Sequence, residues 1–240
     1  MVASPAERDP RQVRGMFDGI ARRYDLLNRL LSLSLDRRWR RSAAEELLAA
    51  APRRVLDLCG GTGELTLAVL QTTGADLVVC CDFALSMLRR AGPKLGRARL
   101  RERTARVQGD GLCLPFRDGA FDAITVGFGV RNLADLDAGL REMGRVLAPA
   151  GRLVVLEFSE PDRGPVGSLY RFYLGRILPR VGDTVSGRAG PYRYLARTIA
   201  AFPGPAILAG RIREAGFAAC GWRRMTGGIV AVHTAIKGRA

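Results

Sequence analysis

The feature that most constrains this chain is an alternation of short apolar runs with amphipathic segments that begins at Arg53. Such alternation favours a doubly wound, mostly parallel sheet with helices on both faces. The apolar runs predict strands at Val55–Leu58, Leu77–Cys81, Ala105–Val107, Ala123–Val126 and Leu153–Glu157. Apolar residues at helical spacing predict helices at Glu64–Leu70, Ala84–Leu95 and Asp135–Leu147.

The C-terminal part of the chain completes the predicted sheet. A helix is expected at Ile207–Ala215, followed by strands around Phe217–Met225 and Ile229–Ile236. The Thr226-Gly227-Gly228 turn predicts a hairpin, so the last strand should lie antiparallel. The fold class is therefore α/β, with a doubly wound, seven-stranded, mostly parallel sheet of the Rossmann-like kind. The length of 240 residues fits a single domain over residues 1–240.

Two segments depart from the alternation and are predicted to cover the sheet. Residues 1–50 are expected to form a helical N-terminal cover, in which Asp36 is interpreted as the N-cap of a helix that carries Trp39 and Leu47–Leu48. Residues 160–202 contain four prolines, but their six aromatic residues argue against disorder. We therefore expect an ordered helical lid at residues 160–202.

A glycine-rich turn follows the first predicted strand. Gly60, Gly61 and Gly63 lack a Cβ atom, which lets the backbone turn sharply and approach a ligand closely. The dinucleotide-binding spacing GxGxxG is not met, because position 66 is Thr. Asp57, inside the strand end, suits a ligand that carries an amino group, as S-adenosylmethionine (SAM) does. The turn therefore predicts a cofactor site of the SAM type.

Acidic residues follow the next two strands. Asp82 comes about 20 residues after the glycines, where a carboxylate can accept hydrogen bonds from both hydroxyls of a ribose. Asp110 follows the third strand, where it can accept from the adenine amino group, with the Gly111 amide nearby. Because the carboxyl ends of parallel strands meet at one edge of a sheet, these segments should line one crevice. Together they predict a SAM-dependent methyltransferase.

Several longer stretches carry a more specific resemblance. They are Phe17–Asn28, Ser32–Trp39, Asp110–Phe116, Gly127–Asn132, Arg145–Ser159 and Thr226–His233. Through them the chain resembles, nearly end to end, the quinone-biosynthesis C-methyltransferases of the demethylmenaquinone/ubiquinone family. The resemblance implies a class I methyltransferase fold and methyl transfer from SAM to a ring carbon of a reduced polyprenyl quinone.

The resemblance also implies site residues. SAM contacts fall on Thr62, Asp82 and the pair Asp110–Gly111. A further contact, usually a serine, falls on Gly127, which offers only its backbone. Ala150 stands where glycine is common, which makes a left-handed turn there less comfortable. The other departures from the family pattern are Leu27, Asp36 and Ala148.

The reaction requires a group that stabilises charge on oxygen. A ring carbon is a poor nucleophile unless the neighbouring hydroxyl loses its proton, so the site must stabilise a phenolate-like oxygen. Arg131, after the fourth predicted strand, is the first catalytic candidate because its charge is permanent. Tyr24 is the second candidate, and with Asp25 it can complete a hydrogen-bond network. Three further residues are interpreted as packing residues: His233, Trp39 and Trp222.

No metal site is predicted. The five cysteines form no CxxC pair, and the chain has a single histidine. We interpret the cysteines as reduced, small core residues.

The formal net charge of +15 indicates an anionic partner. Only Lys94 and Lys237 among the 38 basic residues are lysines, so part of the arginine excess is interpreted as coding bias. In the lid, aromatic residues alternate with arginines, which suggests a surface that faces an anionic membrane. These arginines are Arg171, Arg176, Arg180, Arg188, Arg193 and Arg197.

We expect the protein in the cytoplasm, with the inner face of the plasma membrane as a peripheral binding surface. Residues Met1–Arg14 are polar and lack the apolar stretch of a signal peptide. The sequence has no run of about 18 apolar residues, so no membrane-spanning helix is predicted.

Several alternatives stay open on the sequence alone. The acceptor can be demethylmenaquinol or a benzoquinol of ubiquinone biosynthesis; the arginine-rich composition, typical of high-GC bacteria, favours the first. An RNA or DNA methyltransferase would suit the charge, but Gly127–Asn132 replaces the usual Asn/Asp-Pro-Pro-aromatic turn, so no nucleic acid partner is expected. A non-catalytic SAM-binding subunit is a further alternative. A homodimer is one possible oligomeric state, which the sequence does not determine.

Overall fold

The structure is a computed structural model that describes residues 15–16, 19, 24–97, 100–161, 164–180, 184 and 190–239, without the side chains of residues 24, 27 and 166. The strands are β1 Arg54–Leu58, β2 Leu77–Asp82, β3 Thr104–Gln108, β4 Phe121–Gly127, β5 Leu147–Phe158, β6 Phe217–Met225 and β7 Val230–Lys237. The α-helices are α2 Tyr24–Leu31, α3 Leu35–Glu45, α4 Glu64–Thr72, α5 Leu85–Leu95, α6 Leu136–Val146, α7 Pro165–Phe172, α9 Pro191–Ala201 and α10 Pro205–Glu214.

The seven strands form one sheet in the order β3-β2-β1-β4-β5-β7-β6. The first five strands pair in parallel, and β7 lies antiparallel to both β5 and β6. This arrangement confirms the predicted seven-stranded, mostly parallel sheet and its antiparallel last strand. The strand order reverses between β1 and β4, which is where open α/β sheets bind their ligands.

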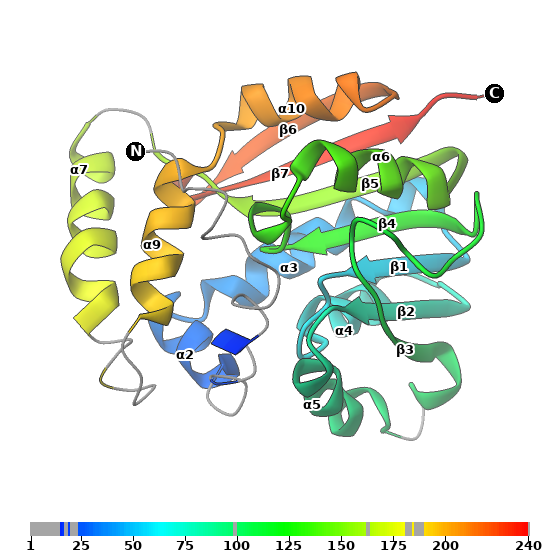
Figure 1. The fold of residues 1–240 in the computed structure, drawn as a ribbon, viewed down its shortest axis with the longest axis horizontal. Coiled ribbons are helices and arrows are strands. Elements are labelled where there is room, and N and C mark those ends of the chain that lie inside the picture. The colour runs from blue at the N-terminus through cyan, green and yellow to red at the C-terminus, as the bar shows by residue number, and fades with distance from the viewer. Residues whose placement is uncertain are drawn as a thin grey trace.

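Helices cover both faces of the sheet, as the near-continuous apolar strands predict. Leu140 and Met143 of α6 pack with Leu208 and Ile212 of α10 against one face. On the other face, side chains of α3, α4 and α5 pack against the sheet, among them the fully buried Val69. In Figure 1 the two layers lie on opposite sides of β1, β4 and β5.

The N-terminal cover is helical in its described part, but its start signal differs from the prediction. Helix α3 begins at Leu35 after Ser34, which has a left-handed backbone, so the prediction that Asp36 is the N-cap is wrong. Asp36 is instead buried and forms an ion pair with Arg40 one turn further on. The helix ends at Glu45, before Leu47–Leu48.

The predicted lid is also helical. Helix α7 continues through a π-helical turn at Tyr173–Ile177, and α9 follows after a stretch that is only partly described. Figure 1 shows α7 and α9 beyond the carboxyl ends of β4 and β5, with α2 below them. The cover and the lid therefore face each other across the edge of the sheet where the site is expected.

The five cysteines are free thiols. Cys80 and Cys81 are buried in β2, where burial raises the pKa of both thiols. Cys113 is exposed, so the prediction that the cysteines are core residues is wrong for this position. It lies in the loop after β3.

Candidate active site

The glycine-rich turn connects β1 with α4 at the strand-order reversal. Cys59, Gly61 and Gly63 have positive φ angles of 55°, 56° and 82°. Glycine adopts such angles without strain, so only Cys59 is strained. A Cβ atom on Gly60 would lie 2.6 Å from Cys80 Sγ, and one on Gly129 would lie 2.3 Å from Cys59 Cβ. The turn is therefore packed so closely that its backbone lies directly against the neighbouring segments.

Asp57 is not accessible at the end of β1. Its side chain is completely buried, and its two oxygens accept hydrogen bonds from Thr66 Oγ1 at 2.5 Å and Thr125 Oγ1 at 3.0 Å. Burial raises the pKa of this carboxyl group to about 6, against the opposing effect of the two hydroxyl groups and of Arg40. The prediction that Asp57 meets an amino group of the ligand is wrong; it lies beneath Gly60 and supports the turn.

Asp82 and Asp110 lie at the ends of neighbouring strands, as predicted. Asp82 Oδ2 accepts the Gly61 N–H at 2.8 Å, so the end of β2 is tied to the glycine turn. Asp110 Oδ1 accepts the Leu112 N–H at 2.9 Å, which fixes the loop after β3. A Cβ atom on Gly111 would lie 2.8 Å from Leu133 Cδ2, so a side chain here would require Leu133 to move. The predicted SAM contacts therefore share one edge of the sheet.

Thr62 lies in the same turn, and its hydroxyl contacts the cover. Thr62 Oγ1 donates to Asp25 Oδ1 of α2 at 2.5 Å. Lys94 Nζ lies 2.6 Å from both Asp25 Oδ2 and Glu64 Oε1. Sequence reasoning missed the roles of Lys94 and Glu64; the rarity of lysine in this arginine-rich chain was the available signal.

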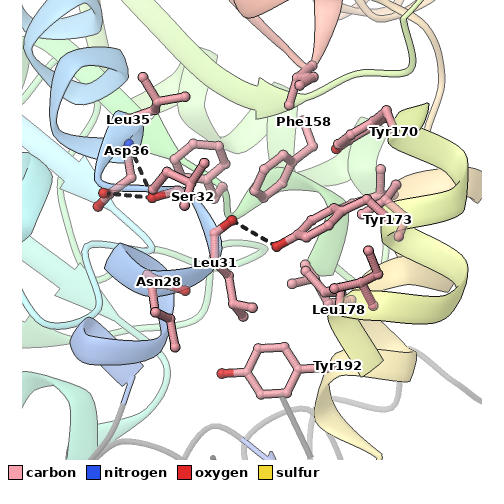
Figure 2. A pocket seen from close by; sticks show the side chains of 18 of the residues that line it. Asn28, Leu31, Ser32, Leu35, Asp36, Phe158, Tyr170, Tyr173, Leu178 and Tyr192 are labelled. Carbon is pink, nitrogen blue, oxygen red and sulfur yellow. Dashed lines mark hydrogen bonds between the residues drawn. The ribbon is translucent and has the colours of Figure 1, made fainter. Parts of the chain in front are cut away.

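A cavity of about 640 Å³ lies between the cover, the lid and the ends of β4 and β5. Its walls are mostly apolar, and Figure 2 shows that lid and cover side chains line it from opposite sides. Tyr173 Oη of the lid donates to the Leu31 carbonyl oxygen of the cover at 2.8 Å, which joins the two walls. A cavity of this size and character fits an apolar organic ligand.

Arg131 lies in the wall of this cavity, in a short 3-10 turn directly after β4. Its guanidinium is buried; Nη1 donates to Glu157 Oε1 at 2.7 Å and to the Phe128 carbonyl oxygen. Burial raises the pKa of Glu157, and the charge of Arg131 acts in the opposite direction. The guanidinium carbon also lies 5.4 Å from the centre of the Phe158 ring. Arg131 is therefore held rigidly at the end of the cavity next to β4.

The remaining predicted residues are distributed as follows. Tyr24 begins α2, but its side chain lies outside the described residues. His233 is buried in β7, where Nε2 lies 2.9 Å from the Pro205 carbonyl oxygen, and burial lowers its pKa. Trp222 is partly exposed on β6, away from the cavity lining. Trp39 donates from Nε1 to Thr226 Oγ1 at 2.8 Å and also lines the cavity.

Residues 5–237 match the model of the ubiE/COQ5 methyltransferase family. The chain belongs to this family. It is 46% identical to the demethylmenaquinone methyltransferase of Mycolicibacterium gilvum over 231 aligned residues. The alignment covers 96% of this chain and 97% of that protein. It is 48% identical to the protein of the same name from Thermus thermophilus over 218 aligned residues. This alignment covers 91% of this chain and 98% of that protein.

The fold agrees with this membership. A SAM-dependent methyltransferase from Thermotoga maritima superposes with a TM-score of 0.61 at 16% identity, over 93% of this chain and 99% of that one. The family match makes the chain a SAM-dependent methyltransferase, and the superposition shows that it has the class I fold. No helix within the described ranges is long and apolar enough to cross a bilayer. Among the same residues, no group of three or more His, Cys, Asp or Glu side chains could hold a metal ion.

Proposed function

We propose that this methyltransferase transfers the methyl group of SAM to a ring carbon of demethylmenaquinol. Relatives at 46% and 48% identity are named demethylmenaquinone methyltransferases, which supports this acceptor. The observation that carries the proposal is a mostly apolar cavity whose wall holds a buried arginine beside the cofactor turn. A quinol combines an apolar ring and tail with polar ring oxygens, so it matches such a cavity. A polar or charged acceptor would lose more hydration there than it recovers.

The cofactor contacts of the proposal follow the edge of the sheet. Gly60, Gly61 and Gly63 would offer backbone to SAM, and Asp82 would accept hydrogen bonds from its ribose hydroxyls. Asp110 and the Gly111 amide would bind the adenine. When bound, SAM supplies a methyl group on a positively charged sulfur.

The catalytic role falls on Arg131. Its buried charge would stabilise negative charge that builds up on the ring oxygen of the quinol, and this raises the nucleophilicity of the neighbouring ring carbon. Glu157 fixes the guanidinium, so the charge needs no reorientation during the reaction. The cover and the lid would shield the ring oxygen of the bound acceptor from water, which would otherwise compete for it.

Product identification tests the proposal directly. The protein is incubated with labelled SAM and, in separate reactions, reduced demethylmenaquinone, a reduced benzoquinone precursor and tRNA. We expect methylated naphthoquinol as the product. Methylation of the benzoquinol alone would move the protein to ubiquinone biosynthesis, and methylated tRNA would support the nucleic acid alternative. SAM binding without any methylated product would indicate a non-catalytic subunit.

Replacement of the arginine tests its role. Arg131→Ala should abolish turnover while the dissociation constant of SAM stays within about threefold of the wild type, because Arg131 meets the acceptor and not the cofactor. Arg145→Ala is the matched control: Arg145 also pairs with a glutamate, Glu142, at 2.7 Å, but it lies outside the cavity lining. This control should keep its turnover. A large loss of SAM affinity in Arg131→Ala would place the arginine in the cofactor site instead.

We further propose that the cavity opens toward an anionic membrane surface. Leu30, Leu33, Leu169 and Ile177 line the cavity and are also exposed, Leu33 by 82%. Solvent-exposed leucines of this kind suit an interface with acyl chains. Exposed arginines of the lid at 171, 176 and 180 supply charge complementary to anionic lipids, while Arg188 lies outside the described residues.

Co-sedimentation with lipid vesicles tests the membrane proposal. Binding should be strong to vesicles that contain phosphatidylglycerol, weak to pure phosphatidylcholine, and reduced by salt. Leu169→Asp should weaken binding to the anionic vesicles relative to the wild-type protein. Ile207→Asp, which changes an equally exposed residue on α10 outside the cavity lining, should not. Equal effects of the two substitutions, or no binding to anionic vesicles, would refute the proposed surface.

A further inference from the structure

A chain of polar contacts joins the N-terminal cover to the cofactor turn. Asp25 of α2 accepts a hydrogen bond from Thr62 with one carboxylate oxygen and contacts Lys94 with the other, at 2.5 and 2.6 Å. Lys94, near the end of α5, also contacts Glu64 at the start of α4. Three segments that are distant in the sequence, α2, the start of α4 and the end of α5, therefore meet at one ammonium group.

The ammonium group is essential to the local charge balance. Asp25 and Glu64 are both held 2.6 Å from Lys94 Nζ, so without the lysine two carboxylates would face each other at short range. Arg29 also approaches Glu64, but at 3.6 Å and with a more exposed side chain. The side chains of Lys94, Asp25 and Glu64 are only 24%, 28% and 18% exposed, so salt screens their interaction less than it screens surface pairs.

Lys94 acts at a distance from the acceptor. It does not line the cavity, whereas α2 does so through Asn28, Leu30 and Leu31. The contact of α2 with the glycine turn passes through Asp25 and Thr62, and Lys94 holds the second oxygen of that same aspartate. The position of α2 relative to the cofactor turn therefore depends on the lysine.

We infer that Lys94 is a positioning residue that holds Asp25, and with it helix α2, closed over the cofactor turn. The inference deepens the proposed function, on which it rests for the assignment of the turn to SAM. Lys94 needs no contact with SAM or quinol for this role. Its loss should release α2, and SAM should then bind more weakly because one wall of its site is no longer fixed.

A double-mutant cycle on the full-length protein tests the inference. Lys94→Met should raise the dissociation constant of SAM, measured by calorimetry, by about tenfold. The same substitution in an Asp25→Asn background should change it less than about twofold, because the contact through which Lys94 acts is then already weakened. Hydrogen exchange of the α2 amides, residues 24–31, should be faster in Lys94→Met. Lys237→Met, which removes the only other lysine, should leave both quantities unchanged; Lys237 Nζ donates to the Leu147 carbonyl oxygen on β5.

Two results would overturn the inference. A tenfold loss of SAM affinity that persists in the Asp25→Asn background would mean that Lys94 acts without Asp25. Unchanged SAM affinity and unchanged exchange in Lys94→Met would mean that α2 does not depend on the lysine. Neither readout involves an acceptor, so a failure to methylate quinol would count against the proposed function and leave this test intact.

Discussion

The buried carboxyl group of Asp57 predicts an unusual dependence of stability on pH. Its pKa is raised from the ordinary value of 3.8 to about 6 by burial. Between these two values the folded protein holds a proton that the unfolded chain has lost, so the free energy of unfolding should fall as pH rises. At about 1.4 kcal/mol per pKa unit, the full effect corresponds to about 3 kcal/mol. The fall in the free energy of unfolding is nearly complete above about pH 6.5.

The perturbation is Asp57→Asn, which keeps the shape and the ability to pair with Thr66 and Thr125 but removes the titration. Urea unfolding of both proteins at a series of pH values gives the two free energies. The variant should gain about 2.5 kcal/mol relative to the wild type between pH 4 and pH 7, because the aspartate of the unfolded chain is already partly ionised at pH 4. Other titrating groups contribute equally to both proteins, so the difference isolates Asp57.

A second variant sharpens this test. The hydroxyl of Thr66 favours the ionised carboxylate and lowers the pKa of Asp57. Thr66→Val should therefore raise that pKa, and the decline in stability should extend to higher pH. A difference between wild type and Asp57→Asn that stays constant from pH 4 to pH 7 would refute the reasoning. The carboxyl group would then have its ordinary pKa in spite of its burial.

Two further substitutions should stabilise the protein. Ala150 has a φ angle of 59°, so Ala150→Gly should raise the free energy of unfolding by about 1 kcal/mol in urea unfolding, whereas Ala148→Gly, whose φ is not positive, should lower it. The Tyr170 hydroxyl is buried without a hydrogen-bond partner among the described residues, so Tyr170→Phe should raise the melting temperature. Tyr173→Phe, which removes the hydrogen bond to Leu31, should lower it; the same sign in both tyrosine variants would contradict this account.

The sheet and its order of elements could be predicted from the sequence because buried parallel strands leave a strong apolar signal. All seven strands and the helices between them lie within a few residues of their predicted positions, β5 excepted, which begins six residues earlier at Leu147. The acidic residues at the strand ends could be placed for the same reason. A carboxylate that directly follows a parallel strand lies at the carboxyl edge of the sheet, where ligands bind, and this placement does not depend on the rest of the fold.

The errors concern polar residues whose partners are remote in the sequence. Asp57 looks like a ligand-facing acid because nothing local shows that two threonines, one of them 68 residues away, will enclose it. Similarly, no spacing rule connects Arg131 with Glu157, 26 residues further on. Such pairs are determined by tertiary packing, which periodicity does not encode. The error at Asp36 is local instead: Ser34 precedes the helix, and Asp36 pairs with Arg40 one turn further on.

Helix α2 has a consequence for the kinetics of turnover. This eight-residue helix contacts the cofactor turn through Asp25 and walls the acceptor cavity through Asn28 and Leu31. An acceptor packed against that wall keeps the helix in place and thereby blocks exchange of the methyl donor. The two substrates should consequently add in a compulsory order, donor first, and S-adenosylhomocysteine should be the last product released.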